Sequence, residues 1–159
     1  AVNNPSEKSR EAMAQAAHLA GKAINISKTT ACHAISYPIT SYFGIPHGHA
    51  VALTLAQMLI YNSKVAEGDV QGGIKAEDVR RGIEELVVLM GVNSVQKASS
   101  KITTLMQDIG LKSGLSELGI KTEEDIELII DNVDLQRAGN NPRVLTEEGM
   151  RKDILGLIR

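Results

Sequence analysis

Apolar residues recur at three- and four-residue steps along most of this 159-residue chain, which is the spacing that lines one face of an α-helix. In the first such stretch, 7–24, mostly small side chains form the stripe and permit close helix contact: Ala12, Ala16, Leu19, Ala20 and Ala23. No alternation of apolar and polar residues is long enough to predict a strand, and no repeat of fixed period occurs. The pattern therefore predicts an all-α, helical bundle-like domain.

Start and stop signals divide the chain into several helices. A second helix is expected to begin near Thr29 and to bend or end at Pro38, because proline lacks an N–H and crowds the preceding turn. Residues 44–48 have the composition of a loop, and 50–60 is apolar nearly all round, which predicts a buried central helix. Further helices are expected over 75–90, from a Ser94 cap through 109, after a capping box of Thr122 and Asp125, and from Thr146.

The composition excludes several classes of partner. Lys and Arg number 17 against 19 Asp and Glu, so no broad positive field would hold a nucleic acid. The longest apolar run, 50–60, is too short to span a hydrocarbon core of roughly 30 Å, so no membrane partner is expected. A lone cysteine and the lack of a leader pattern predict a cytoplasmic protein. Because the chain starts without methionine in a helical pattern, we expect it to be a piece of a longer protein.

Three of the four histidines lie between residues 33 and 49. His33 is expected on the second helix and His47 just before the buried helix, so a fold-back of the chain would bring their imidazoles together. Imidazole is a ligand of both zinc and ferrous iron. The spacing alone leaves open a metal site and a purely structural pair.

The segment 32–38, CHAISYP, followed by 44–53, GIPHGHAVAL, closely resembles the metal-binding signature of the iron-containing alcohol dehydrogenase family. Residues 17–23 resemble the helix before that signature, and 141–148 resemble the start of the family's closing helix. The resemblance covers nearly the whole chain. It implies that residues 1–159 form a single C-terminal helical metal-binding domain, that the N-terminal nucleotide-binding domain is absent from this chain, and that a divalent metal lies between the two.

The resemblance also implies roles for individual residues. His33 and His47 are the expected metal ligands for Fe²⁺ or Zn²⁺, and the other two ligands, an Asp and a His on one helix, should lie upstream. His18 has Ala14 where that Asp should stand, so it is interpreted as structural. Many members carry a histidine one turn after the first ligand, near the nicotinamide. This chain has Tyr37 there, which makes Tyr37 the candidate catalytic residue and alters the proton-relay step.

Several other residues have a local sequence context that suggests their role. Lys28 is the candidate substrate-binding residue, because it precedes an expected helix start where free N–H groups can help to hold an anion; a solvated lysine is the alternative. His49 is interpreted as a packing or cleft-lining residue, and Cys32 as a buried small hydrophobe. The acidic residues of 123–127 suit the first turn of a helix through the helix dipole.

In the intact enzyme that the resemblance implies, the metal polarises an alcohol or aldehyde oxygen during hydride transfer with NAD(P), which the missing half binds. The expected partners are a small alcohol or aldehyde and the protein's own N-terminal domain, and a homodimer of the full-length enzyme is also allowed. The fragment alone is expected to be inactive. Residues 28–53 look most like a branch that reduces small functionalised aldehydes such as phosphonoacetaldehyde.

The sequence leaves two alternative functions open. The chain could be half of a glycerol dehydrogenase or a dehydroquinate synthase-like enzyme, although these usually carry Glu where His49 stands. It could also be a metal-free helical interaction domain, in which His33 and His47 only fill a core.

Overall fold

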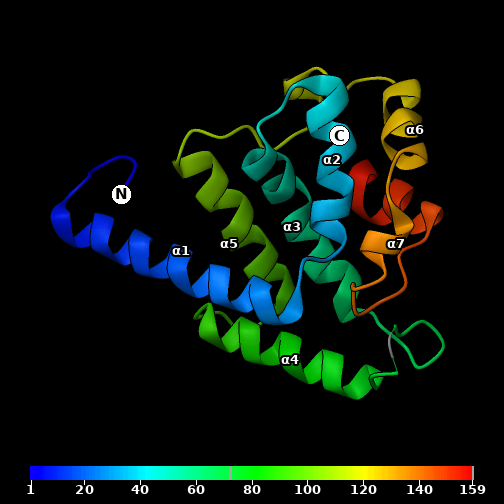
Figure 1. Cartoon of the computed structure of the whole chain (residues 1–159), viewed down its shortest axis with the longest axis horizontal. Helices are drawn as coiled ribbons and strands as arrows, with labels where there is room; N and C mark the ends of the chain where they lie inside the picture. Colours follow the sequence, from blue (N-terminus) through cyan, green and yellow to red (C-terminus); the bar gives the residue numbers. More distant parts are fainter. Residues whose placement is uncertain (72, 159) are drawn as a thin grey trace.

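The computed structural model describes residues 1–71 and 73–158, and over these residues it is built from helices without a strand. This confirms the predicted all-α class, and Figure 1 shows the helices gathered around α2 and α3. The elements are α1 (Glu7–Ser27), α2 (Ala31–Phe43), α3 (His47–Ser63), α4 (Ala76–Leu89), α5 (Val95–Asp108), η1 (Ser116–Leu118), α6 (Glu123–Asp131), α7 (Leu135–Ala138), η2 (Gly149–Ile154) and η3 (Leu155–Leu157).

The core forms where α2 and α3 pack against each other and against the later segments of the chain. Helix α3 also contacts α5, α4 and η2, while α2 contacts α6 and α7. The largest fully buried apolar side chains come from α2, α3, α6, η2, η3 and the residues that flank η1: Ile35, Ile39, Leu53, Leu115, Ile120, Ile129, Met150, Ile154 and Leu155. The predicted central helix is therefore present, but one side of it stays open, since Leu55 is 44% exposed.

Pro38 lies inside α2 and does not end it. The helix continues to Phe43 although Pro38 has no N–H to donate to the preceding turn. Ile35, Pro38 and Ile39 are buried, so packing on the core offsets the lost hydrogen bond. Helix α2 ends at Gly44, which has a φ of 68° and donates its N–H to the carbonyl of Thr40.

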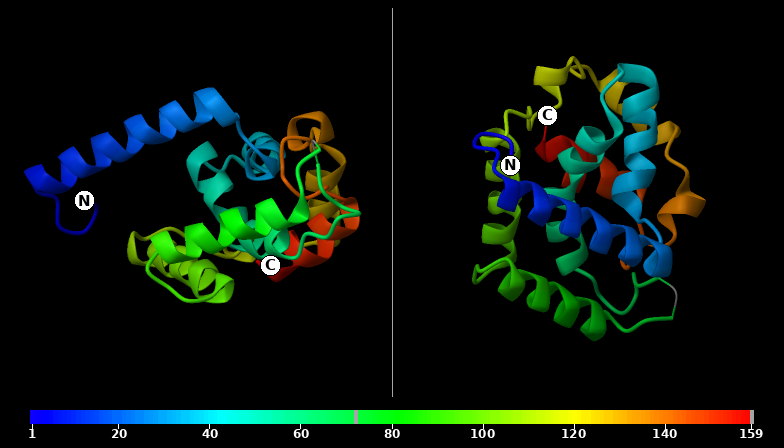
Figure 2. Two further views of the ribbon diagram at one scale, coloured as in Figure 1. Left: turned by 90° about the horizontal axis from the view of Figure 1, so that it is seen from below. Right: turned by 60° about the vertical axis from the view of Figure 1, so that its left-hand side comes forward.

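Helix α1 stands apart from the core. None of its residues is buried, and Figure 2 shows it projecting from the rest of the molecule. Its apolar side chains Leu19 and Ile26 are 63% and 84% exposed, so the predicted stripe has no helix against it among the residues described. At its C-terminal end the chain is tied down by Asn140, whose Nδ2 donates to the carbonyl of Ser27 at 2.6 Å.

The predicted helix caps are present. Ser94 Oγ accepts from the N–H of Lys97 at the start of α5, and Thr122 and Asp125 form a reciprocal capping box at α6. Thr146 Oγ1 accepts from the N–H of Gly149 at 3.0 Å, although the helix that follows is of the π and 3₁₀ types rather than a regular α-helix. No helix within 1–71 and 73–158 is long and apolar enough to cross a membrane.

A group of polar contacts joins the end of α3 to the segment before η2. The guanidinium of Arg143 pairs with Asp69 at 2.7 Å, donates to the carbonyl of Tyr61 at 3.0 Å, and lies 4.2 Å from the centre of the Tyr61 ring. The Tyr61 hydroxyl in turn donates to the carbonyl of Val144 at 2.6 Å. These contacts close the chain around α3 and hold the C-terminal segment on the core.

Candidate functional site

The structure brings His33 and His47 together, as the expected fold-back requires. His33 lies in the first turn of α2, and His47 is the first residue of α3. The two helices pack side by side, and the centres of the two imidazole rings lie 5.5 Å apart with their planes at 58°. His33 is half-buried and His47 is exposed. One ion could therefore contact both rings while remaining open to a ligand from outside this chain.

Ser36 determines which nitrogen of His47 is free. Its hydroxyl is fully buried and donates to the carbonyl of His33 at 2.7 Å. The same oxygen lies 3.2 Å from His47 Nδ1. A hydroxyl has one hydrogen, so once that hydrogen is given to the carbonyl the oxygen must accept from Nδ1–H. This assignment by hydrogen counting leaves the lone pair of His47 on Nε2, where a metal can bind.

Tyr37 lies on the exposed side of the histidine pair. It follows His33 by one helical turn, its ring centre lies 5.6 Å from that of His47, and it is 42% exposed. The guanidinium of Arg137, from α7, lies 5.0 Å from the centre of the Tyr37 ring. Asp134 pairs with Arg137 Nε at 3.1 Å. The site thus continues from the two imidazoles through a phenol to a cation.

Lys28 does not occupy the helix start that its sequence context suggested. It forms the C-cap of α1 with a φ of 60°, and α2 begins at Ala31 after an N-cap at Thr30. The free N–H groups of α2 therefore lie further along the chain than expected. Lys28 nevertheless lines a hollow of about 600 Å³ together with Arg137 and Asn140. Lys28 therefore lies at the C-terminus of one helix, beside the charged side chains of Asp134 and Arg137 that line the same hollow, and not at a helix N-terminus.

The environment of His33 favours its neutral form. Burial lowers the pKa of His33 below its ordinary value, and the nearby charge of His47 lowers it further. A neutral imidazole keeps the lone pair that metal binding needs, so His33 is available as a ligand near neutral pH.

The other histidines and the cysteine lie outside this arrangement. His49 Nε2 lies 2.7 Å from the carbonyl oxygen of Lys112, which can only accept a hydrogen bond. This nitrogen therefore carries a hydrogen and donates it to that carbonyl. That contact agrees with a packing role for His49. Cys32 is buried, and burial raises the pKa of its thiol to about 11, so it is not a nucleophile. His18 lies exposed on α1.

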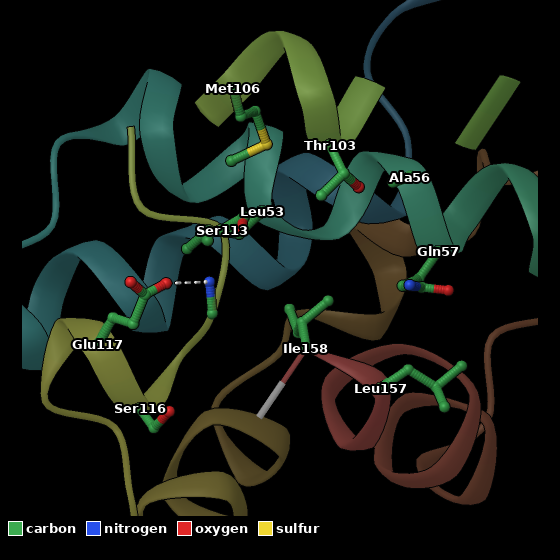
Figure 3. Close-up of a pocket in the computed structure, with 11 residues that line it drawn as sticks. Leu53, Ala56, Gln57, Thr103, Met106, Ser113, Ser116, Glu117, Leu157 and Ile158 are labelled. Atoms are coloured by element: carbon green, nitrogen blue, oxygen red, sulfur yellow. Dashed lines mark hydrogen bonds between the residues drawn. The ribbon is translucent and has the colours of Figure 1, made fainter. Parts of the chain in front are cut away.

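Among the described residues, no group of three or more His, Cys, Asp or Glu side chains converges on one point. Two neighbouring imidazoles are fewer than the ligands of a closed metal centre. A separate hollow of about 370 Å³, lined by Leu53 and Ile158, contains none of the candidate residues (Figure 3). Its one carboxylate, Glu117, already accepts from the N–H of Gly114 at 3.1 Å.

Sequence reasoning missed Ser36 and Arg137. Ser36 had a detectable signal, because a residue three positions after His33 shares its helix face. Arg137 had none, because its approach to Tyr37 joins two helices that are far apart in the sequence.

These features define a helical domain that presents two imidazoles at an open edge, and the sequence comparisons identify its class. Residues 1–156 match the family described as "Fe-containing alcohol dehydrogenase family, C-terminal". The chain therefore belongs to this family. The expected resemblance is therefore confirmed.

Among the relatives, the chain is 32% identical to a phosphonoacetaldehyde reductase of Streptomyces viridochromogenes over 92% of its own length and 36% of that protein. It is 29% identical to a 1,3-propanediol dehydrogenase of Klebsiella pneumoniae, over 94% of the chain and 36% of that enzyme. A crystal structure of sulfoacetaldehyde reductase from Bifidobacterium kashiwanohense in complex with NAD⁺ is also similar, with 31% identity and a TM-score of 0.61, covering 82% of the chain and 31% of that protein. The chain thus spans about a third of the length of these relatives.

Proposed function

We propose that this chain is the C-terminal metal-binding domain of an NAD(P)-linked aldehyde reductase that also runs in reverse as an alcohol dehydrogenase. The observation that carries the proposal is the pair of imidazoles, 5.5 Å apart, with the Nδ1 of His47 held by a buried hydroxyl. In this proposal an N-terminal domain outside residues 1–159 binds the nucleotide. We therefore expect these residues alone to be inactive.

His33 and His47 would hold Fe²⁺ or Zn²⁺, since both metals accept neutral imidazole. Two imidazoles bring no negative charge, so we expect the upstream domain to supply the remaining ligands, including a carboxylate. When bound, the metal would polarise the substrate oxygen while the nicotinamide cofactor supplies the hydride. The lowered pKa of His33 favours the ligand form of this residue near neutral pH.

Tyr37 is proposed to move the proton. Its ring lies 5.6 Å from that of His47, so its phenol belongs to the same edge of the domain as the proposed metal ligands. In the direction of reduction, Tyr37 Oη would donate a proton to the oxygen of the nascent alcohol. The ring is 42% exposed, which allows water to return the proton to Oη.

The proposed substrate is a short aldehyde that carries an acidic group. Support comes from two relatives, one named as a phosphonoacetaldehyde reductase and one as a sulfoacetaldehyde reductase. Lys28, our candidate for substrate binding, lines a hollow near the same edge of the domain and would face the acidic group.

Metal analysis of the full-length protein tests this proposal. His47→Ala and His33→Ala should each reduce bound metal to background and abolish NAD(P)H-dependent aldehyde reduction. His18→Ala is the matched control, because His18 and His47 are both exposed helical histidines and only His47 belongs to the pair. Full metal retention by the His47→Ala protein would contradict the ligand assignment. A wild-type protein that holds no metal after metal-replete expression and reduces no aldehyde would instead favour a metal-free interaction domain.

A further inference from the structure

We infer that Arg137, with Lys28 beside it, forms a subsite that binds the acidic group of the substrate and selects aldehydes bearing a tetrahedral oxyanion. The inference rests on the proposed aldehyde reductase function and names the residues that would determine its specificity. It follows from the position of Arg137, its unused nitrogens and the hollow that it lines.

Arg137 lies close to the proposed metal ligands. The guanidinium of Arg137 lies 5.0 Å from the centre of the Tyr37 ring, and that ring lies 5.6 Å from the ring of His47. Arg137 is therefore two contacts away from the proposed metal ligand. A short aldehyde with its oxygen beside the histidines would place its far end near this cation.

The hydrogen bonds of Arg137 leave its outer edge available. Its Nε is paired with Asp134 Oδ2 at 3.1 Å, whereas Asp134 Oδ1 accepts from the N–H groups of Gln136 and Arg137 at 3.0 and 3.1 Å. Asp134 thus caps α7 and orients the side chain of Arg137 at the same time. No residue within 1–71 and 73–158 accepts a hydrogen bond from Nη1 or Nη2 of Arg137. This fork can bind two oxygens of one oxyanion.

The hollow supplies a second cation. Lys28 and Arg137 both line it, and its volume is about 600 Å³. Asp134 also lines it, so the two cations outnumber the carboxylate by one. Asn140 keeps the Lys28 segment beside α7, because its Nδ2 donates to the carbonyls of Ser27 and Thr29 at 2.6 and 3.1 Å. The hollow is therefore held open between α1 and α7 with a net positive charge.

The two cations Arg137 and Lys28 would not strengthen the binding of a neutral aldehyde, which has no anionic group to pair with them. A phosphonate or sulfonate presents several oxygens in a tetrahedral array, and two of them can meet the two outer nitrogens of Arg137 while a third faces Lys28. The substrate class assigned by the structure is thus a short aldehyde ending in such a group.

The test compares two aldehydes and one inert anion on the full-length protein. We would measure kcat/KM with phosphonoacetaldehyde and with propanal, and the Kd of phosphonoacetate by calorimetry. In Arg137→Gln, the ratio of kcat/KM for the anionic over the neutral aldehyde should fall about tenfold or more, and phosphonoacetate should bind more weakly by a similar factor.

Arg81→Gln is the matched control. Arg81 pairs with Asp78 at the same i,i+3 spacing as Arg137 with Asp134, and the two arginine side chains are equally exposed, at 62%. It lies on α4 and does not line the hollow. The control should leave both measurements as they are in the wild type.

Asp134→Asn gives a change of opposite sign. Asparagine keeps the capping oxygen but removes the competing charge, so phosphonoacetate should bind roughly twofold more tightly. A role of Arg137 in folding alone would not produce this gain.

The outcomes separate the two proposals. If the wild type reduces neither aldehyde, the proposed function is wrong, and the phosphonoacetate titration still judges the subsite. If the wild type reduces aldehydes but Arg137→Gln leaves both the kcat/KM ratio and the Kd unchanged, the subsite is wrong while the function stands. Equal effects of Arg81→Gln and Arg137→Gln would also overturn the subsite.

Discussion

Replacing Ser36 with Ala should weaken metal binding by the full-length protein without unfolding it. The Ser36 hydroxyl donates to the carbonyl of His33 and accepts from His47 Nδ1, so it determines the tautomer of a proposed ligand. Without it, Nδ1 of His47 loses this acceptor, and the ring can adopt the tautomer whose Nε2 carries hydrogen. That tautomer cannot bind a metal through Nε2.

The size of the effect follows from the geometry. Loss of a hydrogen bond to a histidine ligand commonly lowers metal affinity 10- to 100-fold, and the Ser36–His47 distance of 3.2 Å is long for such a bond. We therefore expect a decrease of about tenfold. The cost to stability should be only about 1 kcal/mol, because the carbonyl of His33 keeps its ordinary helical partner when the hydroxyl is removed.

Zinc affinity is measured by competition with a chromophoric chelator, and stability by thermal unfolding of the metal-free protein. Ser63→Ala is the matched control, because Ser63 Oγ donates to the carbonyl of Ile60 at the same distance of 2.7 Å but touches no histidine. It should lower stability slightly and leave zinc affinity unchanged. Unchanged zinc affinity in Ser36→Ala, or an equal loss in both variants, would refute the reasoning.

Two further predictions concern stability. Since burial, and then the charge of His47, lower the pKa of His33 from its ordinary value of 6.5, the unfolded chain binds this proton more readily, and the free energy of unfolding should decrease as the pH falls below 6.5. Urea unfolding on both sides of that pH tests this, and His33→Gln should remove that part of the pH dependence. Gly149→Ala should destabilise the protein by about 1–3 kcal/mol, because the new Cβ would lie 2.8 Å from Cε2 of Tyr61. Gly82→Ala, with no atom within 4 Å of its Cβ, should instead stabilise α4 by up to about 1 kcal/mol, and equal melting temperatures for the two variants would contradict this.

Much of the fold could be predicted because its signals are local. The caps at Ser94 and Thr122 depend on residues three positions apart, and the apolar spacing reports directly on a helix face. The prediction that the helix bends or ends at Pro38 was wrong about the end, because α2 continues to Phe43. Pro38 does cost the helix a backbone hydrogen bond, but the packing of its neighbours on the core outweighs this cost. The sequence predicts a helix start next to Lys28, whereas Lys28 caps the end of α1 and α2 begins at Ala31. A shift of the helix boundary by two residues is enough to cause this difference.

The sequence by itself determined the helical class, the family signature and the candidate pair His33 and His47. The tertiary structure alone decided that a buried hydroxyl faces His47 Nδ1 and that Arg137 lies over Tyr37. Both contacts arise where separate helices pack, and packing depends on the shape of the whole core rather than on any short segment. The identities of the groups that we propose to bind metal are therefore local properties of the chain, whereas the charges and hydrogen bonds around them are properties of the fold.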